Sequence, residues 1–191
     1  MARRSAVSVV GPFAETGGEI MPVLDEIDVR TREVLDWSGI HLLHFSGSSC
    51  SQKVRIFLNL KGIDWQPHHI DLAQRENATD WFMGINPRGL VPVLVHDGSV
   101  IIESNDILEY LEEHFPSPVL IPADQRAQMH ELLRAEDDLH LDLRSLSMRY
   151  LFNAKGAMRT PEDLSAYQRT GSGTVGGRID TEKQKQVEFF K

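Results

Sequence analysis

The sequence contains a single cysteine, Cys50, among its 191 residues. One cysteine makes no disulfide within the chain and supplies no set of thiolates for a zinc site. Cysteine-poor chains are typical of reducing compartments, so we expect a cytoplasmic protein. We expect no metal site either, because no cysteine or carboxylate cluster accompanies the histidines at positions 41, 44, 68 and 69.

The chain also lacks an excess of positive charge and a long apolar run. It has 20 Lys and Arg against 28 Asp and Glu, a formal net charge of −8. Phosphate binding needs a basic patch, so we expect no nucleic acid as partner, whereas a small anionic ligand needs only a local donor cluster. A helix needs about 18 consecutive apolar residues to cross a membrane, and the sequence has no run of that length, so we expect no transmembrane helix. Residues 6–10 are too short an apolar stretch for a signal peptide.

Residues 1–38 show no sustained hydrophobic periodicity. They carry Gly11-Pro12 and Gly17-Gly18, which are typical of irregular chain. We therefore predict a largely flexible N-terminal extension over residues 1–38, with room for one short helix at residues 25–35. A disordered tail or an expression remnant is an alternative interpretation of the same composition.

A regular pattern begins at residue 39 and continues to residue 122. Apolar residues recur at helical spacing over residues 51–61 before Gly62, and Asp97-Gly98 is a two-residue hairpin turn between β-branched runs. The predicted order is strand 41–45, helix 51–61, strand 64–72, short helix 77–84, strand 91–96, strand 99–102 and helix 105–115. The first strand–helix–strand unit implies parallel pairing, and the hairpin adds an antiparallel pair. The pattern predicts an α/β, thioredoxin-like domain with a mixed four-stranded sheet.

The strand patterns stop after Pro122. The remaining chain predicts helices over residues 124–153, 161–168 and 181–191, with a glycine-rich loop at residues 170–177. Residues 123–191 are therefore expected to form an all-helical domain. We expect that domain to be partial, because Phe189-Phe190-Lys191 places two aromatic residues in a helix with no helical partner after it.

The run Ser48-Ser49-Cys50 lies where the helix at residues 51–61 begins. Free backbone N–H groups and the positive end of the helix dipole stabilise an anion at such a position. A thiolate held there is more nucleophilic at neutral pH than a free thiol. The thiolate belongs either to Cys50 or to a bound ligand.

Two further pairs, Val91-Pro92 and Glu103-Ser104, lie at strand ends. Proline belongs at the start or edge of a strand because it cannot donate to the ladder. A cis Pro92 would turn the Val91 backbone outward toward a peptide-like ligand, whereas an ordinary trans edge proline is the commoner case. Ser104 is a good helix cap; alternatively its hydroxyl and the nearby N–H groups bind a carboxylate while Glu103 binds an ammonium group.

The order and spacing of these features resemble the glutathione S-transferase superfamily. The segment from Ser48 to Ile56, followed by Leu60-Lys61-Gly62-Ile63, is most similar to the zeta class, the maleylacetoacetate isomerase family. Asn86-Pro87, Val91-Pro92, Glu103-Ser104 and the helix around residues 107–113 also match the superfamily pattern. The resemblance covers residues 41–122.

The resemblance implies glutathione as co-substrate and a small electrophile as second substrate. Val91 would pair with the cysteinyl part of glutathione beside a cis Pro92, and Glu103 and Ser104 would hold its γ-glutamyl end. Ser48 or Ser49 would donate a hydrogen bond to the glutathione sulfur. Family members are commonly homodimers, so the resemblance also implies a homodimer.

Three kinds of chemistry remain open at the Ser48-Ser49-Cys50 run. We favour activation of the glutathione thiol by a serine hydroxyl. The alternatives are a glutaredoxin-like Cys50 that forms a mixed disulfide with glutathione, and a run that takes part in no reaction. The functional prediction is a glutathione transferase. A zeta-type glutathione-dependent isomerase and a non-catalytic binding module are the alternatives.

Overall fold

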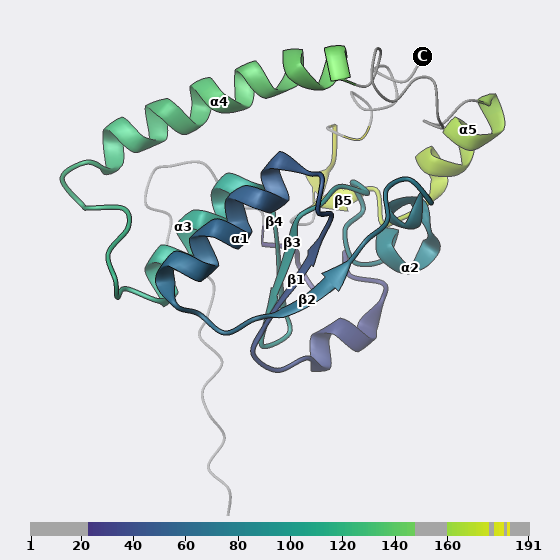
Figure 1. Cartoon of the computed structure of the whole chain (residues 1–191). Helices are drawn as coiled ribbons and strands as arrows, with labels where there is room; N and C mark the ends of the chain where they lie inside the picture. Colours follow the sequence, from purple (N-terminus) through teal and green to yellow (C-terminus); the bar gives the residue numbers. More distant parts are fainter. Residues whose placement is uncertain (1–22, 148–159, 176–177, 182, 184–191) are drawn as a thin grey trace, which may run out of the picture.

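The computed structural model describes residues 23–147, 160–175, 178–181 and 183. Its centre is a four-stranded sheet in the order β2-β1-β3-β4 (Figure 1). β1 pairs with β2 in parallel and with β3 antiparallel, and β3 and β4 form an antiparallel hairpin. The predicted α/β fold with a mixed sheet is confirmed, and it is followed by a helical region.

The elements follow the predicted order closely. In the described residues they are η1 (Arg32–Asp36), β1 (Ile40–His44), α1 (Ser49–Lys61), β2 (Gln66–His69), η2 (Glu76–Ala78), α2 (Asp80–Met83), β3 (Val93–His96), β4 (Ser99–Ile102), α3 (Ser104–His114), α4 (Arg126–Ser147), α5 (Pro161–Arg169), β5 (Thr174–Val175) and β6 (Arg178–Ile179). The predicted glycine-rich loop at residues 170–177 instead contains β5, which pairs antiparallel with β6 just after the loop. The ends of the predicted helices 124–153 and 181–191 lie outside the described residues.

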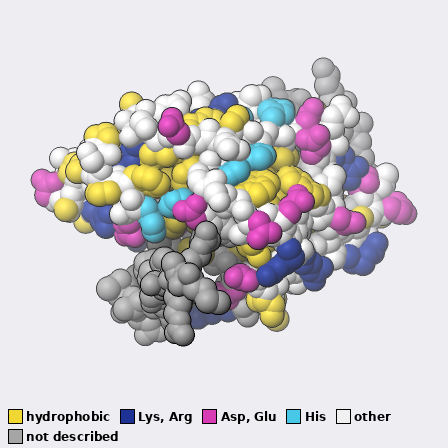
Figure 2. All heavy atoms as spheres, turned by 90° about the horizontal axis from the view of Figure 1, so that it is seen from below, with side chains coloured by type: hydrophobic (Ala, Val, Ile, Leu, Met, Phe, Trp, Pro, Cys, Tyr) yellow, Lys and Arg dark blue, Asp and Glu magenta, His cyan; other side chains and the backbone are white. Residues whose placement is uncertain are grey.

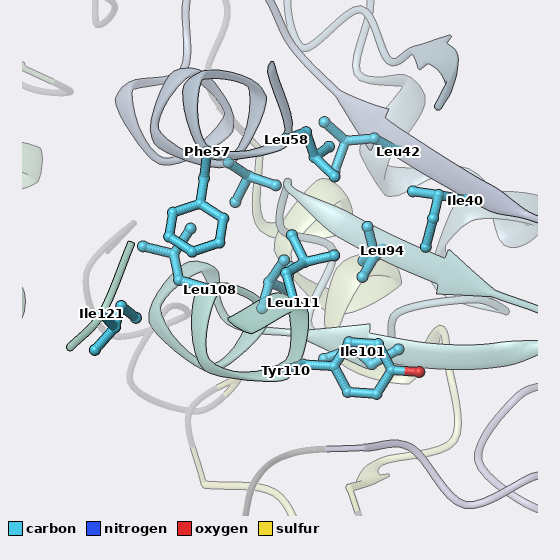
Figure 3. Close-up of a cluster of buried hydrophobic side chains, with 12 residues drawn as sticks. Ile40, Leu42, Phe57, Leu58, Leu94, Ile101, Leu108, Tyr110, Leu111 and Ile121 are labelled. Carbon is cyan, nitrogen blue, oxygen red and sulfur yellow. The ribbon is translucent and has the colours of Figure 1, made fainter. Parts of the chain in front are cut away.

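One face of the sheet is covered by α1 and α3. Figure 3 shows Leu42 and Leu94 from the sheet facing Leu58 and Phe57 of α1 and Leu111 of α3. Leu42, Leu58, Leu94 and Leu111 are fully buried. The two amphipathic helices therefore bury their apolar faces on one side of the sheet, as the helical spacing predicts.

The opposite face is covered by residues 23–36 and by the chain around α2. Leu24, Val29 and Val34 pack against Val93 and Val95 of β3 in one buried cluster. The prediction of a flexible extension over residues 1–38 therefore differs from the structure at residues 23–38. These residues reach the sheet through irregular chain and a 3₁₀ helix, which leave no sustained periodicity in the sequence.

In the view of Figure 2, Lys and Arg side chains of the described residues gather toward one side of the molecule. Acidic side chains are spread there among hydrophobic and histidine side chains, in keeping with the formal net charge of −8. Among the described residues, no helix combines the length and hydropathy needed to cross a bilayer.

A buried ion pair joins α1 to α3. The Lys61 ammonium lies 2.8 Å from a Glu112 carboxylate oxygen, and the two side chains are only 0% and 5% exposed. Lys61 also donates to the carbonyls of Phe115 and Pro118, at 2.6 and 2.9 Å. Burial opposes ionisation of Glu112, but the hydrogen bonds from Lys61 and from the backbone of residues 120 and 121 hold its pKa below its usual value. Both charges are therefore compensated inside the fold.

We expect Lys61→Met to lower the free energy of unfolding by about 3–5 kcal/mol, because the Glu112 carboxylate would lose its buried partner. Urea denaturation of the full chain measures this. The matched control is Arg32→Met, which breaks the exposed pair with Glu26 and is expected to cost at most about 1 kcal/mol. Equal, small losses in the two variants would contradict the role of the buried pair.

Candidate functional site

Three chain segments meet at one edge of the sheet, and the strand directions explain why. β1 and β4 both run antiparallel to β3, so both end at the edge where β3 begins. Leu43 and Ile102, near those two ends, both pair with Val93 at the start of β3. The helices that follow, α1 and α3, therefore begin at this edge. The positive ends of both helix dipoles lie there.

Ser48 and Ser49 occupy the first positions of α1. Ser48 is the N-cap, and its hydroxyl oxygen accepts a hydrogen bond from the Ser51 N–H at 3.2 Å. The Ser48 hydroxyl can still donate its own proton, because the cap uses the oxygen as an acceptor. Ser49 is exposed and lines an outer groove with Lys53, Ile56 and other residues of α1.

Cys50 lies in the first turn of α1, is half-buried and contacts α4. Its sulfur is 3.6 Å from Nε2 of His140. The Lys53 ammonium holds α4 in place by donating to the Glu136 carboxylate at 2.8 Å. Glu136 and His140 are one helical turn apart, so the same face of α4 carries both contacts. The sequence pattern had given no sign of His140 as part of the site.

A small pocket at this edge brings together residues from all three segments. It is lined by Cys50, Asn86, Leu90, Val91, Pro92, Glu103 and Ser104. The predicted binding residues Val91, Pro92, Glu103 and Ser104 are thus neighbours. Of the run at the start of α1, Cys50 rather than Ser49 lines this pocket.

The loop before β3 is held by its own side chains. The Asn86 side chain accepts from the Arg88 N–H at 3.0 Å and donates to the Leu90 carbonyl at 2.8 Å. The peptide bond between Val91 and Pro92 is cis. Among the hydrogen bonds between described residues, none uses the Val91 backbone. The N–H and C=O of Val91 are therefore available to a ligand beside the pocket.

Glu103 and Ser104 form the start of α3. Glu103 has a φ of 67°, a conformation that costs a non-glycine residue on the order of 1–3 kcal/mol and that occurs preferentially at functional sites. The Glu103 side chain makes no capping bond, although this residue is the N-cap of α3. Ser104 is buried, with 7% of its surface exposed. The N-terminus of α3 therefore lies at the pocket, and the Glu103 side chain accepts no hydrogen bond from the first N–H groups of the helix.

Arg88 links Glu103 to the C-terminal part of the chain. Its guanidinium donates to the Glu103 carboxylate and makes two bonds, of 3.1 and 3.0 Å, to the Asp180 carboxylate. The Tyr167 hydroxyl donates to the Arg88 carbonyl at 2.6 Å. Burial opposes the charge on Arg88, but the bonds and charges of Asp180 and Glu103 outweigh it and raise the pKa of the guanidinium.

Sequence reasoning missed Arg88, His140 and Asp180 as neighbours of the site. Arg88 stands in a turn cluster, which explains its position along the chain without indicating a partner 92 residues away. In the part of the chain that the structure describes, no group of three or more His, Cys, Asp and Glu is arranged to hold a metal ion. The histidines pack on one another instead: His41 and His68 share a hydrogen bond of 2.9 Å and both stack on Trp37.

Comparison with known proteins identifies the segment that carries the site. Residues 47–114 match the family model described as glutathione S-transferase, N-terminal domain. The chain is 46% identical over 85 residues to a zeta-class glutathione S-transferase of Euphorbia esula, covering 44% of this chain and 38% of that protein. It is 42% identical over 83 residues to a maleylpyruvate isomerase of Ralstonia sp, covering 44% and 39%.

The fold is similar to that of solved transferase structures. The β-etherase LigF from Sphingobium sp. strain SYK-6 superposes with a TM-score of 0.61 at 27% identity, covering 80% of this chain and 68% of that one. The match to the two curated relatives spans about two fifths of their length, 38% and 39%. The segment that matches the family model, residues 47–114, includes Cys50, Val91, Pro92, Glu103 and Ser104.

The contact of the Cys50 sulfur with His140 predicts that this histidine influences how fast the thiol is alkylated. An imidazole nitrogen near the sulfur can accept the thiol proton, so we expect His140→Asn to slow alkylation of Cys50 by iodoacetamide several-fold at neutral pH. Cys50 is the single cysteine of the sequence, so mass spectrometry of the whole chain reports on this thiol alone. His130→Asn is the matched control on α4, because His130 contacts Glu109 instead. An equal effect of both variants would count against the pairing.

Proposed function

We propose that the protein binds glutathione and activates its thiol for transfer to a small electrophile. The match of residues 47–114 to the glutathione S-transferase N-terminal domain model supports this proposal. The single observation that carries the proposal is the pocket shared by Cys50, Val91, Glu103 and Ser104. These residues come from three separate segments, and each segment matches a different part of glutathione: its sulfur, its cysteinyl backbone or its γ-glutamyl end.

The middle of the tripeptide would pair with Val91. The Val91 N–H and C=O lie beside the pocket and are not used by any hydrogen bond between described residues. An extended peptide can pair with such a backbone in the manner of an added strand. This pairing would bring the cysteinyl residue of glutathione next to Pro92, with its side chain toward the start of α1.

The γ-glutamyl end would bind at the start of α3. Its α-carboxylate matches the Ser104 hydroxyl and the first N–H groups of the helix, which carry the positive end of the dipole. Its ammonium group matches the Glu103 carboxylate, whose side chain is 41% exposed although it also contacts Arg88. One strand–helix junction thus supplies ligands for both charges.

The sulfur of glutathione would lie at the start of α1. The helix N-terminus favours the thiolate, and a serine hydroxyl that donates to the sulfur favours it further. Ser48 can donate, since its cap uses only its oxygen as acceptor. Ser48, Ser49 and Cys50 all remain candidates for this contact. The serine needs no general base, because the attacking group is the ligand's thiolate.

A glutathione-dependent isomerase of the zeta type is the second candidate. The observation that favours it is the similarity of the chain to a maleylpyruvate isomerase of Ralstonia sp, with 42% identity over 83 residues. In that chemistry, glutathione adds to the substrate and leaves again, so the same thiolate site serves. A binding module without turnover is a further alternative, because the match spans about two fifths of the relatives' length. A homodimer and a cytoplasmic location stay predictions from the sequence.

The function is tested with the full chain in two steps. We expect retention on immobilised glutathione and elution by free glutathione, followed by conjugation of a chloronitrobenzene. Turnover of a maleyl-substituted keto acid without conjugation would favour the isomerase. Retention with neither activity would favour the binding module. The absence of any retention would overturn the proposal in all its forms.

Separate Ser48→Ala, Ser49→Ala and Cys50→Ala variants test the thiolate contact. Loss of the hydroxyl that donates to the sulfur is expected to raise the pKa of the bound glutathione thiol by about one to two units, since a hydrogen bond to a charged group is worth about 1.5–3 kcal/mol. The ultraviolet absorbance of the thiolate across a pH series measures this. If neither serine variant changes that pKa and Cys50→Ala abolishes activity, the serine assignment is wrong.

A further inference from the structure

Three charged side chains form a chain of contacts that ends at the proposed glutathione site. Arg88 donates to Glu103 on one side and binds Asp180 through two hydrogen bonds on the other. The Arg88 and Asp180 side chains are only 13% and 4% exposed, whereas that of Glu103 is 41% exposed. The contacts run from a buried acid, through a buried guanidinium, to the acid that faces the pocket.

We propose that Asp180 is a positioning residue for ammonium recognition, acting through Arg88 on Glu103. This inference rests on the proposed binding of glutathione. Asp180 offsets the charge of Arg88 and fixes its guanidinium plane. Glu103 thereby keeps negative charge that Arg88 does not neutralise, and this charge attracts the ligand's ammonium group.

The charge balance explains why the third residue matters. Arg88 and Glu103 alone sum to zero, and such a pair attracts an ammonium group weakly. With Asp180 the three groups carry a net charge of −1. The buried Lys183 ammonium also acts on Asp180, and it stays in place whichever residues occupy positions 88 and 180. A two-bond guanidinium–carboxylate contact also fixes direction, because both groups are planar and meet through parallel hydrogen bonds. Burial increases the effect of each charge, since water screens it less.

The segment that carries Asp180 is anchored independently of Arg88. The Asp180 N–H donates to the Gly173 carbonyl at 3.1 Å, next to the β5–β6 pair. The Thr174 hydroxyl donates to the carboxylate of Asp28, a fully buried residue of the N-terminal segment. Asp180 is therefore held in place by its own backbone, and the guanidinium is oriented against a fixed partner.

The test compares two ligands by calorimetric titration of the full chain. One is glutathione, and the other is glutaryl-cysteinylglycine, in which a hydrogen replaces the ammonium group. The readout is the dissociation constant of the deaminated ligand divided by that of glutathione. A higher ratio therefore means a stronger preference for glutathione. We expect Asp180→Asn to weaken glutathione binding about tenfold and to leave binding of the deaminated ligand nearly unchanged, because only the ammonium meets the uncompensated charge of Arg88. A merely structural role would weaken both ligands equally and would overturn the proposal.

Two controls make the result specific. Asp163→Asn breaks the ion pair of α5 with Arg75, 3.0 Å in length, without touching Arg88, and is expected to keep the wild-type ratio. The double variant Arg88→Gln with Asp180→Asn restores a net charge of −1 and is expected to regain most of the ratio. A double variant that stays as low as Asp180→Asn would contradict the charge argument.

A further variant keeps the test decisive if Asp180→Asn fails to fold. Arg88→Gln alone removes the positive charge and is expected to raise the ratio in favour of glutathione; a fall in the ratio would overturn the proposal. If the wild-type chain binds neither ligand, the proposed function and this inference fall together. If it binds glutathione and no variant alters the ratio, only this inference is wrong.

Discussion

The parallel directions of β1 and β4 are the constraint on which the rest of the site depends. β3 lies between these two strands and runs opposite to both, so one edge of the sheet collects two strand ends and one strand start. Each strand end leads into a helix, and each helix begins with backbone N–H groups that no helical carbonyl can satisfy. Two positive helix ends and an extended backbone segment therefore converge without any special residue. The side chains of Glu103, Ser104 and Cys50 give this edge its chemical selectivity.

The segments outside the sheet keep this edge in a single geometry. α4 lies above α1 and α3 in Figure 1 and is tied to α1 by the contact of Lys53 with Glu136. The chain from α5 to β6 reaches the opposite side of the site through Arg88, which lies between the acids at positions 103 and 180. The site is thus bounded by residues distributed over most of the described chain, although its ligand contacts are concentrated in one domain.

Much of the fold could be predicted because its signals are local. The helical spacing of apolar residues in α1 and α3, the Asp97-Gly98 turn and the continuous apolar run of β3 each depend on a few adjacent residues. The positions of Val91, Glu103 and Ser104 followed from the same local signals. Which member of the Ser48-Ser49-Cys50 run meets a ligand could not be predicted, because it depends on the orientation of the first helical turn.

The remaining contacts could not be predicted, because they join residues that are remote along the chain. Arg88 and Asp180 are separated by 92 residues, and Cys50 and His140 by 90. Residues 23–36 are predicted to be flexible from the sequence because their apolar residues follow no regular period. Their burial depends instead on the shape of the sheet face that they cover. Val34 is fully buried, yet its neighbours in the sequence give no helical or strand pattern.

The ion pair of Lys61 with Glu112 has a consequence for how this sequence can diverge. Each charge is tolerated in the interior only while the other is present, because an unpaired buried charge is strongly destabilising. An apolar pair of similar volume would also be stable there, but every route to it through single substitutions passes through a damaged intermediate. Positions 61 and 112 should therefore covary among relatives, being either both charged or both apolar, while their neighbours on the same helices vary independently.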